Sequence, residues 1–161
     1  MMVRNLQVSF LREKIEDIRS ALLLSESKSV LKLPNCIVST LQVDEMGYIW
    51  LLAPRPRQAI KEFEQKFPVQ LNFYQKGKDF YLNVTGSAGI VLEPSETDEM
   101  LESCGIQKNI LKRWILIKVE IADAQYHVTV PMVKNNWLSY LSAQVNRWLF
   151  PAVANYRTLN A

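Results

Sequence analysis

The stretch from residue 34 to residue 91 constrains the fold more than any other part of the chain, because alternating apolar and polar residues follow one another there between turn signals. Cys36–Val43 alternates in the manner of a strand. Asp44–Gly47 then predicts a tight turn, in which Gly47 supplies the positive φ that a short hairpin needs. Tyr48–Ala53 is predicted as the returning strand. It ends at Pro54, since proline cannot donate to a sheet ladder.

The segment after this hairpin predicts a short helix. The fixed φ of Pro56 suits the first turn of a helix, and Ile60, Phe63 and Phe67 recur at helical spacing. We expect these three side chains to be buried and the helix to end at Pro68.

A second hairpin is predicted beyond Pro68. Val69–Phe73 and Phe80–Thr85 both alternate, on either side of a turn over residues 76–79. Gly86 continues the second strand and predicts a bulge, which a small barrel needs in order to close.

The rest of the chain predicts three helices and a further strand pair. An N-terminal helix is expected at about residues 9–23, from the spacing of Leu11, Ile15, Ile18 and Leu22. Further helices are expected over residues 95–103 and at about 135–150. Residues 114–123 and 125–130 are predicted strands joined by a turn at 122–124. This inventory predicts one mainly β (α+β) domain spanning residues 1–161, a small antiparallel barrel of about six strands with flanking helices.

Composition excludes several functional classes. The 161 residues carry a net charge of +3 without a dense basic stripe, which argues against a nucleic-acid binder. Cys36, Cys104 and the single His127 are too few and too far apart for a zinc site. No segment approaches the length of a membrane span, and the N-terminus lacks the pattern of a signal peptide, so we expect no membrane association and a cytoplasmic protein.

No familiar motif of nucleophilic, metal or acid–base catalysis is present. The most informative polar cluster is Arg55, Arg57 and Gln58 with Lys61 one turn later. Placed at the start of a helix, such cations favour a phosphate group. The alternative is that they are ordinary surface residues.

The order of elements over about residues 20–92, together with the segment AsnValThrGlySerAlaGlyIleVal at 83–91, resembles the FMN-binding split barrels related to pyridoxamine 5'-phosphate oxidase. The general-stress-protein-like branch is the better match. The resemblance implies FMN as cofactor and a homodimer with the cofactor cleft between its subunits. It also implies redox chemistry on an unknown small molecule. The implied cofactor-binding residues are Ser39, Thr40, Leu51, Leu52, Arg55, Arg57, Gln58 and Lys61.

The chain departs from the family pattern at three places. Leu51 and Leu52 stand where the family has an aromatic residue and a threonine, and Pro56-Arg57-Gln58 replaces a Ser-Arg-Lys-like tripeptide. The uncharged Ile37 and Gln42 stand near the positions of the family's basic residues on the preceding strand. These departures leave an alternative open, in which a dimeric barrel has lost flavin and acts as a ligand-binding or stress-related protein. Binding of a polyanion through the Arg55–Lys66 region is a third and weaker alternative.

Overall fold

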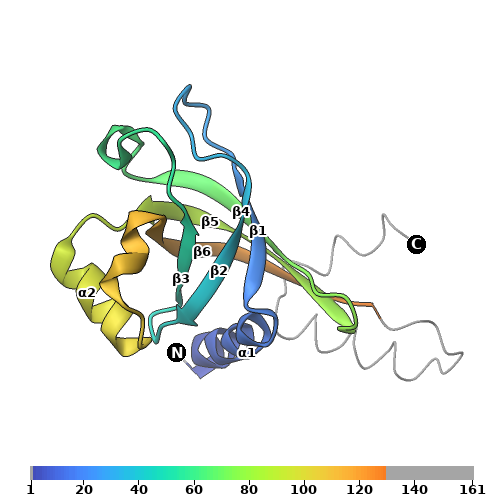
Figure 1. Cartoon of the computed structure of the whole chain (residues 1–161). Coiled ribbons are helices and arrows are strands. Elements are labelled where there is room, and N and C mark those ends of the chain that lie inside the picture. The colour runs from blue at the N-terminus through green and yellow to red at the C-terminus, as the bar shows by residue number, and fades with distance from the viewer. Residues whose placement is uncertain (1, 130–161) are drawn as a thin grey trace, which may run out of the picture.

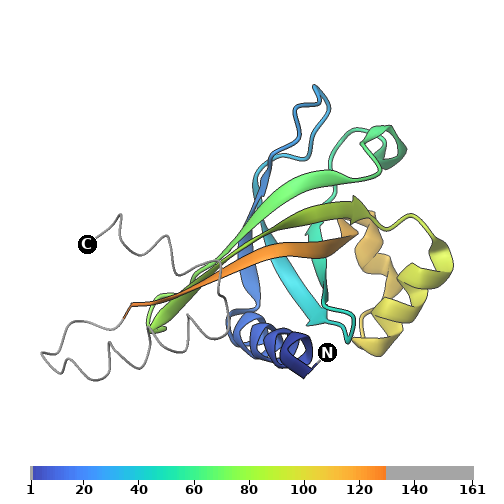
Figure 2. The ribbon, with the colours of Figure 1, turned by 180° about the vertical axis from the view of Figure 1, so that it is seen from behind.

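Six strands form one closed antiparallel barrel in the computed structural model, which describes residues 2–129 (Figures 1 and 2). The order around the barrel is β1-β2-β3-β6-β5-β4. The predicted small antiparallel barrel is therefore confirmed, while the helix expected at 135–150 lies outside the described residues. The strands are β1 (Ser20–Ser25), β2 (Cys36–Val43), β3 (Tyr48–Pro54), β4 (Phe67–Phe73), β5 (Phe80–Ile90) and β6 (Trp114–Val128).

The core fills the inside of the barrel, and a smaller apolar cluster lies outside it. Alternate residues of every strand point inward, among them Leu23, Val38, Leu71, Leu82 and Ile117. The outer cluster consists of Trp50, Leu52, Met100 and Leu116, beneath helix α2 (Pro94–Ser103). The middle of β3 is thus buried on both faces, which explains why Ile49–Ala53 is an uninterrupted apolar run.

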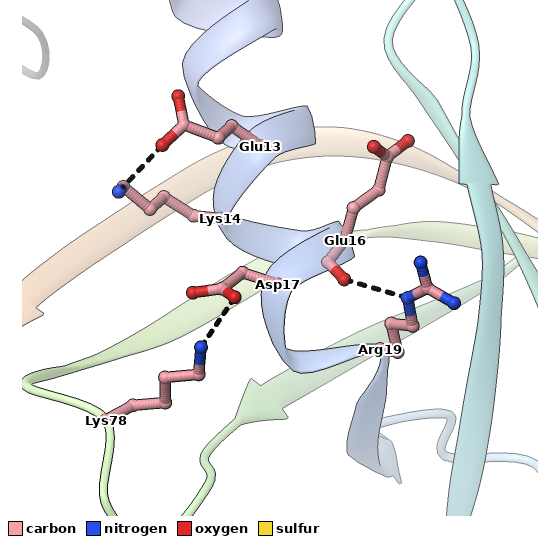
Figure 3. Close-up of polar contacts among 6 residues, drawn as sticks. All are labelled: Glu13, Lys14, Glu16, Asp17, Arg19 and Lys78. Carbon is pink, nitrogen blue, oxygen red and sulfur yellow. Dashed lines mark hydrogen bonds and ion pairs between the residues drawn. The ribbon is translucent and has the colours of Figure 1, made fainter.

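Helix α1 (Met2–Ile18) lies across one end of the barrel, below β1 and β2 in Figure 1. Its buried residues Leu11, Ile15 and Ile18 belong to the barrel core. Near its C-terminal end, an ion pair between Lys78 and Asp17 joins it to the turn between β4 and β5, and Arg19 Nε donates a local hydrogen bond to the Glu16 carbonyl oxygen (Figure 3).

The predicted extension of this helix to residue 23 was wrong. Arg19 adopts a φ of 62°, which ends the helix, and β1 starts at the next residue. Leu22 follows Ile18 at helical spacing, but Ala21, Leu23 and Ser25 alternate as buried residues of a strand. Pairing with β2 and β4 satisfies the backbone of this segment and decides between the two patterns.

The predicted helix after Pro56 was also wrong. Only a three-residue 3-10 turn forms there, η1 (Ile60–Glu62), and Phe67 and Pro68 belong to β4. Phe67 is buried as the first of four inward residues of β4 and not as part of a helical stripe. Pro68 is tolerated because it lies at the strand's beginning, beyond the register that β4 shares with β1.

The predicted bulge at Gly86 is confirmed by a register shift between Thr85 and Gly86 opposite β6. A Cβ atom built on Gly86 would lie 2.1 Å from the carbonyl oxygen of Glu120, so the two backbones approach closely at this point. The turn predicted at residues 122–124 was wrong, because β6 runs through it. Ala124 is buried there and pairs with Val84.

Candidate functional site

A groove of about 260 Å³ opens beside the end of β3, between the last residue of β5, the beginning of β6 and helix α2. Its apolar part includes Ile90, Ile115 and Leu116, and two cations, Arg55 and Lys61, lie among its lining residues. The groove therefore combines an apolar surface with positive charge. This combination suits a flat apolar ring that carries an anionic group.

Arg55 is fixed at the groove by the segment before β6. Its backbone N–H donates to the carbonyl oxygen of Arg113 at 2.8 Å, and its Nε donates to the carbonyl oxygen of Leu111 at 2.9 Å. Leu111 belongs to the 3-10 helix η2 (Lys108–Lys112). The two terminal nitrogens of the guanidinium make no hydrogen bond within the described part of the chain, so they can bind an anion with two parallel bonds.

The positive charge of the groove is not cancelled by its own carboxylate. Asp98 lines the groove but pairs with Lys108 at 2.5 Å, and this hydrogen bond raises the pKa of Lys108 above its ordinary value. None of the ion pairs formed among residues 7–129 involves Arg55 or Lys61. Neither cation is therefore neutralised by a carboxylate in that part of the chain, and both can pair with an anionic ligand.

The structure divides the predicted phosphate-binding residues into two pairs. Arg55 and Lys61 line the groove, whereas Arg57 and Gln58 are exposed on the preceding loop and do not line it. Because no α-helix starts at this loop, a helix N-terminus does not contribute to anion binding here. The anion site thus rests on two side chains.

The other four predicted residues lie on β2 and β3, and neighbouring residues of each strand point to opposite faces of the barrel wall. Thr40 pairs with Leu51, and both are buried, Leu51 within the barrel core. Ser39 pairs with Leu52; Ser39 is exposed on the outer face, while Leu52 is covered beneath α2. None of these four residues lines the groove.

Sequence reasoning missed the part of the groove that comes from residues 90–116. Ile90, Leu111 and Ile115 reach Arg55 only because β3 pairs with β6, with Pro54 opposite Trp114. The sequence predicted residues 114–123 as a strand, but it did not predict which strand pairs with it. Single-sequence periodicity gives a strand's faces and says nothing about which neighbour it pairs with.

Another cavity, of about 340 Å³, lies near Lys118 and is lined by residues of β5 and β6, by Tyr48 of β3 and by the segment leading into α2. Lys118 Nζ is 2.8 Å from Glu96 Oε1 and 4.7 Å from the ring centroids of both Tyr48 and Trp50. An ion pair and two cation–π contacts already hold this ammonium group. It is therefore a packing element beneath α2.

The described residues give no arrangement in which His127 or the cysteines would act in catalysis or bind a metal ion. The ring of His127 stacks on Tyr81 at 4.5 Å between centroids, across the β5–β6 pair. Within residues 7–129 no group of three or more His, Cys, Asp or Glu side chains could hold a metal ion. Among the described helices, none has the length and hydropathy to cross a membrane.

Comparison with known proteins supports the fold. No family model and no curated protein matches the sequence. Solved structures that share the fold include a protein assigned to the general stress family from Xanthomonas campestris pv. campestris (17% identity, TM-score 0.57, covering 81% of this chain and 91% of that one). Another is the general stress FMN/FAD binding protein from Xanthomonas citri (17% identity, TM-score 0.56, covering 81% and 93%).

A third structure comes from Clostridium acetobutylicum and is related to general stress protein 26, of the pyridoxinephosphate oxidase family (11% identity, TM-score 0.55, covering 79% and 92%). The resemblance predicted from the sequence is thus confirmed for the fold. At such identities the likeness is one of architecture, and function has to be argued from the site.

Proposed function

We propose that this protein binds a flavin nucleotide, FMN, and acts in the cytoplasm in flavin-dependent redox chemistry on a small molecule. The observation that carries the proposal is the placement of Arg55 and Lys61 at an apolar groove whose carboxylate, Asp98, is already paired. The sharing of this fold with a protein described as FMN/FAD binding supports the same assignment.

The residues present fit a flavin phosphate better than they fit the flavin ring's polar edge. Arg55 and Lys61 would hold the phosphate, and Ile90, Ile115 and Leu116 offer an apolar surface to a planar ring. When bound, the flavin supplies the electron or hydride transfer, while the chain binds and orients it. This division explains why no nucleophile or acid–base pair is visible in the sequence.

The direct test is the visible absorption spectrum of the full chain after incubation with FMN and desalting, with a dissociation constant from quenching of flavin fluorescence. We expect a retained flavin spectrum and saturable quenching. A protein that shows neither would contradict the proposal.

The alternative, a barrel that binds a different small ligand without flavin, is favoured by one observation. Leu52, at the position where related proteins offer a threonine hydroxyl, is 5% exposed and packs beneath α2. It can neither donate a hydrogen bond to a flavin nor reach one. Failure of the flavin test with an intact fold would select this alternative.

We further propose that the protein is a homodimer and that the outer face of β2, β1, β4, β5 and the C-terminal part of β6 forms the contact. Ile37, Leu22, Asn72, Asn83 and Gln125 lie side by side in one row across five strands. Asp123, opposite Thr85, is a charged neighbour of this row. The other neighbouring outward residues are uncharged: Ser20, Leu24, Ser39, Gln70, Tyr74, Tyr81, Thr85 and His127. A low density of charge together with exposed apolar and aromatic side chains is typical of the centre of an interface.

Sedimentation velocity tests the dimer. Ile37 is 62% exposed at the β2 end of this row, and Ile37→Lys would place a charge on this face in both copies. We expect the variant to sediment as a monomer and the native chain as a dimer. Met46→Lys is the matched control, because Met46 is 76% exposed in the turn before β3, away from this face. A native monomer, or a dimer that survives Ile37→Lys, would contradict this assignment.

A further inference from the structure

A cavity of about 410 Å³, called the second cavity below, is lined by residues of the segment 106–114 and shares no lining residue with the groove. Besides the aliphatic Ile106 and Ile110, three kinds of side chain line it. Trp114 offers a half-buried aromatic surface, Gln107 and Asn109 offer amides, and Lys112 and Arg113 offer positive charge. An aromatic ring stacks on any nucleobase, amides can pair with the edge of a base, and cations bind phosphate. The cavity therefore has the chemistry of a nucleotide site.

Two arginines connect this cavity to the groove. The strand pair β3–β6 ends with Pro54 opposite Trp114. Directly beyond it, the N–H of Arg55 donates to the carbonyl oxygen of Arg113 at 2.8 Å. Arg55 lines the groove and Arg113 lines the second cavity, so their backbones meet at the boundary between the two.

The cations that line the groove and the second cavity are not neutralised by carboxylates within residues 7–129. All the ion pairs within residues 7–129 are made by Lys14, Lys66, Lys78, Lys108 and Lys118. Arg55, Lys61, Lys112 and Arg113 therefore have no carboxylate partner in that part of the chain. Four cations contributed by two distant segments exceed what one phosphate monoester requires.

We propose that the second cavity binds an adenine nucleotide, with a diphosphate group between Arg55 and Arg113 and the purine ring against Trp114. Joined to the groove, the two sites take a flavin dinucleotide, in which the same diphosphate links the flavin half to the adenosine half. The dinucleotide part of this inference rests on the proposed flavin binding. The adenine nucleotide site stands on its own residues.

Isothermal titration calorimetry on the full chain with ADP, inorganic pyrophosphate, FMN and FAD tests both parts. We expect ADP to bind more tightly than pyrophosphate, and FAD to bind at least about tenfold more tightly than FMN, since the adenosine half adds contacts at the second cavity. Pyrophosphate binding as tightly as ADP would overturn the role of Trp114. FAD binding no more tightly than FMN would overturn the joined site.

The double variant Lys112→Gln/Arg113→Gln shows which residues are responsible. It should weaken the binding of ADP and of FAD about tenfold or more. The affinity for FMN should stay almost unchanged, because neither residue lines the groove. Lys28→Gln/Lys32→Gln, which changes two exposed lysines between β1 and β2, is the matched control and should alter nothing. A double variant that binds ADP normally would overturn the site.

The two proposals fail separately. Binding of FMN without any binding of ADP overturns the adenine nucleotide site and leaves the flavin function standing. Binding of ADP that depends on Arg113, without binding of either flavin, supports the nucleotide site and overturns the flavin function.

Discussion

The indole N–H of Trp50 donates to Oδ2 of Asp44 at 2.9 Å, and Oδ1 of the same carboxylate accepts the backbone N–H of Tyr48 at 2.9 Å. One side chain thus fixes both the turn between β2 and β3 and the orientation of the largest side chain in the outer apolar cluster. Arg12 of α1 donates to the carbonyl oxygen of Asp44, so the helix is joined to the same turn.

Asp44→Ala should destabilise the protein by about 2 kcal/mol, because it removes two hydrogen bonds to a charged acceptor and leaves the buried Trp50 N–H unpaired. Urea denaturation followed by tryptophan fluorescence measures the change. Glu45→Ala, at the exposed neighbouring position, is the control and should cost less than about 0.5 kcal/mol. Equal effects of the two changes would show that the Asp44 contacts contribute no stability.

Gly86→Ala should cost about 3 kcal/mol or prevent folding, since its Cβ would meet the Glu120 carbonyl oxygen at 2.1 Å and the barrel backbone would have to shift. Gly77→Ala is the comparison. Its φ of 92° costs an alanine about 1 kcal/mol, but nothing lies within 4 Å of the added atom. Thermal unfolding of both variants measures which one loses more stability. A larger loss for Gly77→Ala would show that φ strain dominates and would contradict the prediction.

Thr40→Val should leave stability unchanged or raise it by up to about 1 kcal/mol. The Thr40 hydroxyl is buried and has no hydrogen-bond partner among the described residues, so replacing it with a methyl group removes an unpaired polar atom. Flavin affinity should not change, because Thr40 is buried beside Leu51, away from the groove. If the variant lost flavin binding while keeping full stability, Thr40 would have to belong to the flavin site.

Arg55→Gln should weaken FMN binding about tenfold or more, whereas Arg57→Gln should change it less than about twofold. The two residues are indistinguishable by charge and by closeness in sequence, but only Arg55 lines the groove. Flavin fluorescence titration of both variants decides between them. A larger effect at Arg57 would favour the phosphate position implied by the family pattern.

The sequence predicted the strands that are bounded by clear turn signals. Cys36–Val43 was predicted with its observed bounds, because alternation stops at a turn in which Gly47 has a φ of 89°. Gly86 was predicted as a bulge for a similar reason, as glycine within a strand needs a backbone explanation.

Predictions failed where two periodicities coexist in one segment. Ile60, Phe63 and Phe67 fit a helix, but Phe67 also begins the alternation that continues through Val69, Leu71 and Phe73. Tertiary pairing with β1 and β5 selected the strand. The candidate site shifted for the same reason: without a helix at Pro56, the anion site was left to Arg55 and Lys61, completed by residues from the β6 side.

The position of β6 in the ring sets the order in which the molecule can be completed during synthesis. Before residues 114–128 emerge from the ribosome, the other five strands can form only an open sheet in the order β3-β2-β1-β4-β5. Its two edges, β3 and β5, then present unpaired backbone groups to any passing chain. The last described strand joins both edges at once, so the nascent protein is exposed to wrong pairing until translation has passed Val128.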